Sequence, residues 1–258
     1  MSQGQKQFGV LEYTRSILSM LFFFLMLVIF TPIILLGLLL TFGKFSNFVV
    51  EKIAPLVARA TLVINGIQFK IENHTGPKVP FPAVFVINHS STLDMLTVLA
   101  LGLPRVRFVA KWQFQYNPIF LILGRLTGQV FIRREQSEKA IQTLQKNVKR
   151  IHRQKLSVLM APEGSRKHPG IIGPFKKGPF RMAMDLQYPI VPIYLEGNRE
   201  LSTGAFLVTK PGLCKAHIHP PIDTSGWKFD TLEKHISEVR SLYLNWAGVD
   251  EQSNHLPG

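Results

Sequence analysis

A long apolar run near the N-terminus sets the first part of this chain apart from the rest. Between Arg15 and Lys44, 28 consecutive residues carry no charged side chain. As one straight helix the run would measure about 40 Å, which exceeds the roughly 30 Å of a bilayer's hydrocarbon core. Pro32 lies near its middle and predicts a kink or a break. We therefore expect residues 1–60 to form a membrane anchor, either one kinked span or a two-helix hairpin that dips into one leaflet.

Two other interpretations fit this run less well. A signal peptide has an apolar region of only about 7 to 15 residues, and a helix buried in a soluble core rarely needs so long an apolar stretch. Basic residues flank the run on both sides, so the bias of positive charge toward the cytoplasm predicts no strong orientation. Such a balance of basic residues favours the hairpin, in which both flanks lie on the same side of the membrane.

After the anchor, short apolar segments rich in β-branched residues alternate with longer helical patterns. A connecting helix is predicted at 46–60, and the alternation at 61–72 around Asn65-Gly66 is typical of a hairpin where a sheet begins. Strands are predicted at 83–88, 106–110, 129–132, 156–160, 190–195 and 215–219. Helices are predicted at 92–101, 118–126, 137–152, from 178 onward, and at 231–246. Residues 61–258 therefore form an α/β domain with a central, mostly parallel sheet flanked by helices.

The charge of the chain is concentrated in one third of it. Its formal net charge is +14, with 30 basic and 16 acidic residues, and residues 105–181 hold 17 of the basic residues but only three acids. This block indicates one basic face or pocket for an anionic partner, such as nucleic acid or an anionic membrane. Cys214 is the single cysteine, which excludes an internal disulfide and four-thiolate metal sites.

Candidate catalytic residues follow the strand predicted at 83–88. His89 stands at the strand end, where α/β sheets place their sites, and Asp94 follows five positions later. A neutral imidazole can take a proton at pH 7, and a carboxylate on its other nitrogen orients the ring and stabilises the imidazolium. The alternative is that Asp94 or Ser90 caps the next helix and His89 is a surface residue.

Three later segments, each at a predicted strand end, decide between these interpretations. They are GQVFIRR at 128–134, PEGSR at 162–166 and VPI at 191–193. Together with NHSSTLD at 88–94 they resemble the four ordered motifs of the glycerolipid acyltransferases, most closely the 1-acyl-sn-glycerol-3-phosphate acyltransferase branch. The resemblance extends over about residues 61–200, and the N-terminal run looks like the two-helix membrane element of bacterial members.

The resemblance implies roles for individual residues. His89 would be the general base and Asp94 its orienting partner. Arg166 would supply the main charge for the acceptor's phosphate. The further residues implied for the phosphate site are Lys111, Arg134, Glu163, Gly164 and Ser165.

The chain departs from the family pattern at two positions in and after the PEGSR segment. Family members more often carry threonine where Ser165 stands and serine where Lys167 stands, which bears on acceptor preference. Glu163, among so many cations, is interpreted as an ion-pair partner of a pocket arginine rather than as a catalyst. Lys176 and Lys177 fit either headgroup binding or a solvated loop.

The implied reaction is transfer of an acyl group from a thioester to the sn-2 hydroxyl of 1-acyl-sn-glycerol-3-phosphate, giving phosphatidic acid. It needs no cofactor; acyl-CoA or acyl carrier protein would be the co-substrate and membrane lipids the partners. We expect a membrane location with the site at the cytoplasmic face, at the inner membrane in a bacterium. Another lysolipid could replace the acceptor.

Other function classes have less support. A serine hydrolase would need a G-x-S-x-G elbow, which the chain lacks. A zinc site of Cys214, His217 and His219 lacks a fourth ligand nearby, so we expect no metal and interpret the two histidines as a solvent-facing pair on an edge strand. A non-catalytic nucleic-acid-binding protein rests on charge alone and is disfavoured because no binding motif is present. A lipid-binding module without activity would share the phosphate pocket, and the presence of His89 with Asp94 discriminates against it.

Overall fold

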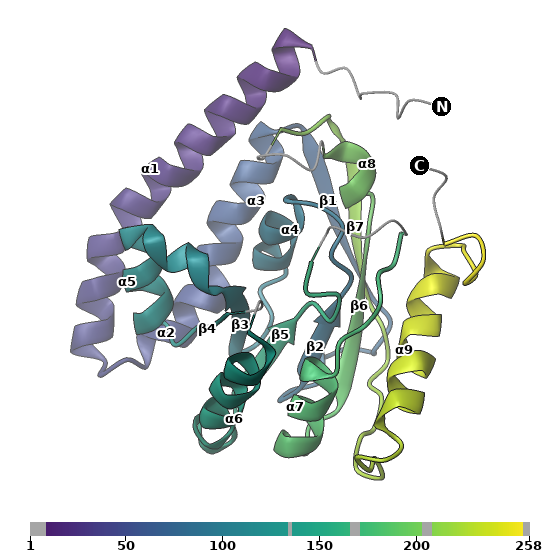
Figure 1. The fold of residues 1–258 in the computed structure, drawn as a ribbon. Helices are drawn as coiled ribbons and strands as arrows, with labels where there is room; N and C mark the ends of the chain where they lie inside the picture. Colours follow the sequence, from purple (N-terminus) through teal and green to yellow (C-terminus); the bar gives the residue numbers. More distant parts are fainter. Residues whose placement is uncertain (1–8, 134–135, 166–170, 203–207, 255–258) are drawn as a thin grey trace.

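The computed structural model describes residues 9–133, 136–165, 171–202 and 208–254. Within these residues seven strands form one sheet in the order β1-β7-β6-β2-β5-β3-β4 (Figure 1). The strands are β1 (Ile67–Asn73), β2 (Val84–Ile87), β3 (Val106–Lys111), β4 (Val130–Ile132), β5 (Ser157–Met160), β6 (Ile190–Glu196) and β7 (Gly212–Ile218). Neighbouring strands pair in parallel except β6 and β7. The mostly parallel α/β fold predicted from the sequence is confirmed.

Helices cover both faces of this sheet. Strands β2 and β5 are buried along their whole length, as expected of central strands in a parallel sheet. On one face they contact α6 (Ser137–Arg153), α7 (Gly178–Leu186) and α9 (Leu232–Trp246). On the other face lie α3 (Ala54–Ile64) and α4 (Asp94–Ala100). The shorter helical elements are α2 (Phe45–Phe48), the π-helical turn Val49–Ile53, the 3-10 helix Trp112–Tyr116, α5 (Pro118–Leu126) and α8 (Asn198–Leu201).

The N-terminal run forms a single helix, α1 (Val10–Leu40), which is 31 residues long. It continues through Pro32, so the expected hairpin with its turn at that proline is wrong. Proline removes the hydrogen bond to the carbonyl four residues earlier, but it does not prevent the helix from continuing. The Thr31 hydroxyl donates to the Leu27 carbonyl at 2.5 Å in the same turn.

The chain reverses after α1 rather than within it. Ile34 packs in one cluster with Val49, and Phe23 packs in another with Leu62, so α1 and the segment from α2 to α3 run antiparallel. The connecting helix predicted at 46–60 is confirmed and extends to Ile64. The boundary expected at residue 60 falls inside α3, which packs against both α1 and α4.

The outer side of α1 exposes large apolar side chains to solvent. Only 17% of its most apolar 18-residue window is buried, which distinguishes it from the core helix of a soluble protein. The helix is long and apolar enough to cross a membrane. An exposed apolar surface of this extent marks a site of membrane or protein attachment, and its composition indicates a membrane.

The hairpin expected at Asn65-Gly66 is also wrong. Asn65 ends α3 in the right-handed helical region, Gly66 follows with φ +74°, and β1 begins at Ile67. Both a tight hairpin and a helix C-terminus place glycine at positive φ, so the dipeptide alone fits either. The sheet does begin here, but β1 pairs in parallel with β7. Strand β7 therefore lies inside the sheet and is not the expected edge strand.

Charges placed on the exposed side of α1 should weaken membrane attachment. Leu21, Leu25 and Leu36 are 60%, 55% and 57% exposed, so replacing them removes little packing. Each aspartate in hydrocarbon costs about 2.5 to 3.5 kcal/mol. We expect the triple aspartate variant to shift from the membrane pellet to the supernatant on sedimentation.

A matched control is Phe229→Asp, because Phe229 is 61% exposed in the loop before α9. This variant should stay in the pellet. Unchanged sedimentation of the triple variant would contradict attachment through α1.

Candidate active site

His89 and Asp94 meet in the turn between β2 and α4. His89 Nδ1 lies 2.9 Å from Asp94 Oδ2, and the backbone N–H groups of Ser90 and Ser91 donate to the same oxygen at 2.8 and 3.0 Å. Asp94 is 1% exposed, whereas the His89 side chain is 23% exposed. Asp94 is itself the first residue of α4, which has no side-chain cap, so neither Asp94 nor Ser90 caps this helix; Asp94 instead organises the preceding turn and orients an accessible imidazole.

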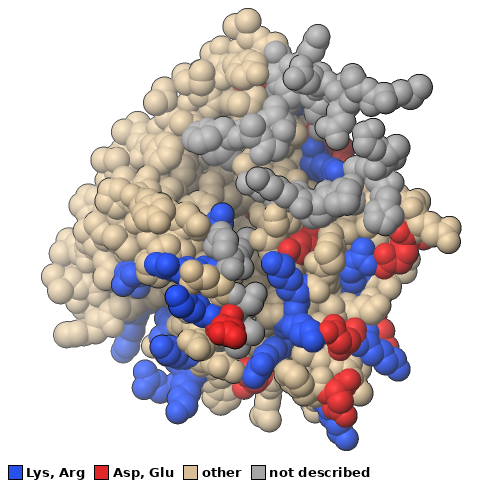
Figure 2. All heavy atoms as spheres, viewed as in Figure 1, with Lys and Arg blue, Asp and Glu red and all other residues tan. Residues whose placement is uncertain are grey.

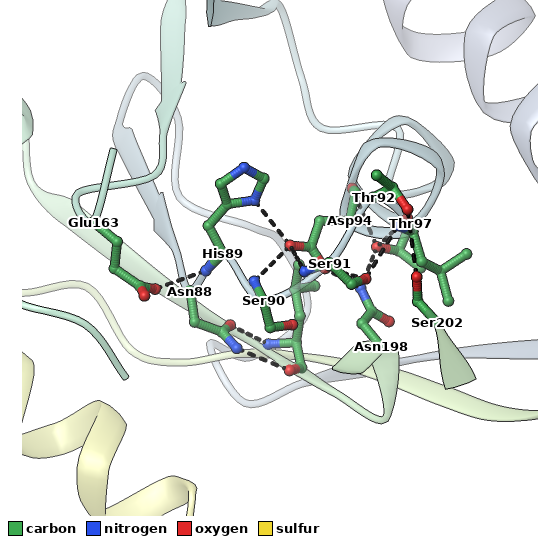
Figure 3. A network of polar contacts seen from close by, with 12 residues as sticks. Asn88, His89, Ser90, Ser91, Thr92, Asp94, Thr97, Glu163, Asn198 and Ser202 are labelled. Carbon is green, nitrogen blue, oxygen red and sulfur yellow. Dashed lines mark hydrogen bonds and ion pairs between the residues drawn. The ribbon is translucent and has the colours of Figure 1, made fainter. Parts of the chain in front are cut away.

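The second oxygen of Asp94 is held by Asn198, the first residue of α8 (Asn198–Leu201). The Asn198 amide donates to Asp94 Oδ1 at 2.8 Å and to the Thr97 hydroxyl at 2.9 Å, and the Ser91 hydroxyl lies 3.4 Å from Oδ1. Asn198 is fully buried and follows β6, beside Asp94 in Figure 3. No sequence pattern assigned a role to Asn198, although its polar side chain three residues after the strand predicted at 190–195 was a usable signal.

This arrangement sets the chemistry of His89. A buried carboxylate is stable only with hydrogen bonds, and five donors surround Asp94. With its Nδ1–H donated to Asp94, the imidazole presents Nε2 as the basic nitrogen. In Figure 3 the other ring nitrogen points away from Asp94. The pair can therefore accept a proton from a group placed beside Nε2.

Glu163 connects this turn to the PEGSR segment after β5. Its Oε1 accepts the backbone N–H of His89 at 2.7 Å, and its Oε2 accepts that of Gly173 at 2.9 Å. The side chain is 4% exposed. A carboxylate has no donor for a phosphate oxygen, so this geometry gives Glu163 a positioning role.

Lys176 lies against the glycine of the same turn. Gly164 has φ +67°, a value that glycine adopts without strain. A Cβ there would stand 3.2 Å from Lys176 Nζ, and the Lys176 N–H donates to the Pro162 carbonyl at 2.9 Å. Lys177 is different, because its ammonium pairs with the exposed Glu233. The structure thus separates two adjacent lysines that the sequence could not distinguish.

The other residues predicted to bind the phosphate lie at or after the ends of neighbouring strands. Lys111 is the last residue of β3 and stands opposite Ile132 of β4. Arg133 follows β4 with its guanidinium 4.8 Å from the Trp112 ring centre. Ser165 lies in the PEGSR segment that follows β5. Arg134 and Arg166 lie outside the described residues.

The described residues of the basic block do not all face one pocket, contrary to the expectation. Arg107 is 3% exposed and donates to Ser46 and Asn47, which fastens β3 to α2. Burial, with Arg150 and Arg105 nearby, lowers its pKa to about 10. Part of the block is therefore structural. Figure 2 shows other basic side chains gathered over α6 and α7, while the surface along α1 is uncharged in that view.

Strand direction brings the chemistry-bearing segments together. Strands β2, β5 and β6 run parallel, so the turns that follow them lie at one edge of the sheet. Asn88 strengthens this edge, because its side-chain amide exchanges hydrogen bonds with the backbone of Leu195 at 3.0 and 2.7 Å. The segments that follow β5 and β6 therefore meet the turn that carries His89 and Asp94.

Comparison with known proteins gives consistent matches. A family model described as Acyltransferase matches residues 70–196. Mouse 1-acyl-sn-glycerol-3-phosphate acyltransferase alpha is 30% identical over 75% of this chain and 68% of its own length. The 1-acyl-sn-glycerol-3-phosphate acyltransferase of Haemophilus influenzae is 29% identical over 86% of this chain and 96% of its own. This chain spans 66% to 68% of the length of several plant and mammalian relatives.

A solved structure matches the fold. The crystal structure of the 1-acyl-sn-glycerophosphate acyltransferase from Thermotoga maritima superposes with a TM-score of 0.68 at 21% identity. The match covers 93% of this chain and 98% of that one, so the N-terminal helix belongs to the shared fold as well.

Removing Asn198 should destabilise the protein. Asn198→Ala removes the donor at 2.8 Å from Asp94 Oδ1, where only the Ser91 hydroxyl at 3.4 Å remains, and the donor to the Thr97 hydroxyl. Loss of these buried hydrogen bonds costs about 1 to 3 kcal/mol. We expect a lower midpoint of denaturant unfolding, measured in detergent. Asn245→Ala, on the exposed side of α9, is the control and should change stability by no more than about 0.5 kcal/mol. Equal midpoints for the two variants would mean that the Asn198 amide does not support Asp94.

Proposed function

This chain belongs to the acyltransferase family, and we propose that it transfers a fatty acyl group from a thioester to the sn-2 hydroxyl of 1-acyl-sn-glycerol-3-phosphate, giving phosphatidic acid. One observation carries the proposal: the Asp94-bound imidazole of His89 lies at the sheet edge where the basic segments end. The names of the relatives support this acceptor.

The proposed reaction is a direct transfer. His89 Nε2 accepts the proton of the hydroxyl, and the alkoxide oxygen attacks the thioester carbonyl. The tetrahedral intermediate collapses, the carbon–sulfur bond breaks, and the leaving thiolate takes the proton from the imidazolium. Asp94 stabilises that imidazolium and keeps Nδ1 protonated.

The contacts of the neighbouring serines support this route over a serine nucleophile. The Ser91 hydroxyl accepts the Leu93 N–H at 3.1 Å and lies near Asp94. The Ser90 side chain points to the other side of the turn from the imidazole in Figure 3. Among the described residues no serine hydroxyl bonds to the His89 ring.

The acceptor's phosphate would bind at the basic turns beside His89. A phosphate monoester carries nearly two charges and three strong acceptor oxygens, which arginine, lysine and backbone amides at a glycine turn satisfy. We assign it to Gly164, Ser165 and Arg166 with Lys111 and Arg134. The position of Lys176 beside Gly164 adds a further cation to this set.

The membrane supplies and receives the lipid in this scheme. The apolar surface of α1 would hold the protein at one leaflet with the site facing the cytoplasm, where acyl-CoA or acyl carrier protein delivers the thioester. Incubation of detergent-solubilised protein with a panel of lysolipids and both donors, followed by mass spectrometry, tests the proposal. Phosphatidic acid from 1-acyl-sn-glycerol-3-phosphate is the expected product; exclusive use of another lysolipid would replace the acceptor.

Loss of the base should abolish turnover. We expect His89→Ala to lower kcat at least about a hundredfold, because a positioned general base contributes roughly 10² to 10⁴. Asp94→Asn should also lower kcat, since it removes the charge that stabilises the imidazolium. Initial rates with both substrates saturating measure the effect. His235→Ala, on α9, should keep normal turnover, and a near-normal rate for His89→Ala would disprove the mechanism.

The adjacent lysines provide a matched pair for the phosphate site. A charge-assisted hydrogen bond is worth about 1.5 to 3 kcal/mol, so Lys176→Ala should raise the KM for the acceptor roughly tenfold or more. The KM for the donor should change little. Lys177→Ala should alter neither, because its ammonium pairs with exposed Glu233. Kinetics with each substrate varied decide the assignment, and equal effects of Lys176→Ala on both substrates would exclude it.

A further inference from the structure

A second cluster of ionisable side chains lies where β1 and β7 pair, outside the site described above. Glu72 of β1 stands directly opposite His217 of β7, and His74 follows β1. One potential ligand atom from each of these three residues lies within 4.8 Å of the other two. We propose that Glu72, His74 and His217 bind one divalent transition-metal ion, with Zn²⁺ the best match to two imidazoles and one carboxylate.

The geometry of the three ligands suits a single ion. Glu72 Oε2 lies 3.1 Å from His217 Nδ1, close to the roughly 3.4 Å that separates ligand atoms around tetrahedral zinc. The rings of His74 and His217 are parallel within 2°, with centroids 5.8 Å apart. His74 is exposed, so its side chain can adjust to the ion at little cost. Two histidines and one glutamate leave a fourth position for water.

Two further side chains support the ligands from outside. His217 Nε2 lies 2.8 Å from Glu196 Oε2 on β6, and a histidine that binds zinc usually donates its second N–H to a carboxylate in this way. Lys215 Nζ lies 3.3 Å from Glu72 Oε1, which leaves Glu72 Oε2 facing His217. The ion would take the place of the proton on His217 Nδ1.

The charges of the cluster also favour a cation. Glu72 and Glu196 contribute two negative charges against the one positive charge of Lys215. With neutral imidazoles the cluster has a net charge of −1, so a dication is not repelled. This set replaces the zinc set considered from the sequence, because Cys214 is buried in the core on the other side of β7.

Metal binding would connect three strands and the active-site edge. The ligands come from β1 and β7, and Glu196 ends β6 directly before Gly197 and Asn198. Asn198 in turn holds Asp94. Because the ion binds the folded protein, it should raise thermal stability, by about 5 °C at an ion concentration near a hundred times the dissociation constant.

Zinc titration of the full-length protein tests this site. The protein is purified in detergent without a polyhistidine tag, treated with chelator and desalted. ZnCl₂ is then added, and thermal unfolding and retained zinc after gel filtration are measured. We expect about one equivalent of retained zinc and a higher Tm. Co²⁺ should give the visible absorption bands of a tetrahedral nitrogen and oxygen site.

Variants test whether the retained zinc and the increase in Tm depend on Glu72, His74 and His217. His74→Ala and His217→Gln should lose the retained zinc and the Tm increase. Glu72→Gln keeps the side-chain size and should weaken zinc binding at least tenfold. This conservative variant tests the site even if a histidine variant folds poorly. His235→Ala is the matched control, because His235 Nδ1 lies 3.1 Å from the carboxylate of Glu238 on α9 in a similar pair. It should bind zinc normally.

Three results would overturn the proposal: no zinc retained by the full-length protein, retention unchanged in all three cluster variants, or equal loss in His235→Ala. None of these measurements uses catalysis. Failure of the metal site is therefore distinguishable from failure of the proposed acyl transfer.

Discussion

Burial of the Asp94 carboxylate is the constraint on which the arrangement of this site depends. A charged group removed from water must have its hydrogen bonds supplied by protein. Here the donors are two turn amides, a serine hydroxyl, the His89 ring and the amide of Asn198. They lie in the segments that follow β2 and β6, so the carboxylate can be satisfied only when these strands are paired. Orientation of the imidazole is thus a consequence of folding the sheet.

A second buried carboxylate extends the same logic to β5. Glu163 accepts the N–H of His89 and that of Gly173, so the backbone of the catalytic turn is held from the side opposite Asp94. Gly164, in the turn proposed to bind the acceptor's phosphate, is the next residue in the chain. Movement of this turn would therefore disturb the backbone of His89, because the hydrogen bond from the His89 N–H to Glu163 Oε1 joins the two.

The basic residues show how one charge pattern serves two purposes. Arg107 is buried and fastens β3 to the helices after α1, and Arg150 donates to the Gly128 carbonyl. Lys111 and Lys176 instead stand at the edge where the strands end. The net charge along a sequence does not distinguish buried structural arginines from lysines at the ends of strands. The two groups of basic residues can be told apart only when the position of each residue relative to its strand is known.

The sequence by itself determined most strands and helices and the apolar anchor, because these follow from local periodicity. It predicted the pairing of His89 with Asp94 only through four ordered motifs that resemble those of a known family. Tertiary structure alone decided the rest. Whether Pro32 breaks α1, and whether Asn65-Gly66 ends a helix or turns a hairpin, depends on which partner the flanking segments pack against. Contacts of Asn198 with Asp94, and of Glu72 with His217, join residues far apart in the chain; strand order brings them together, and no local pattern encodes strand order.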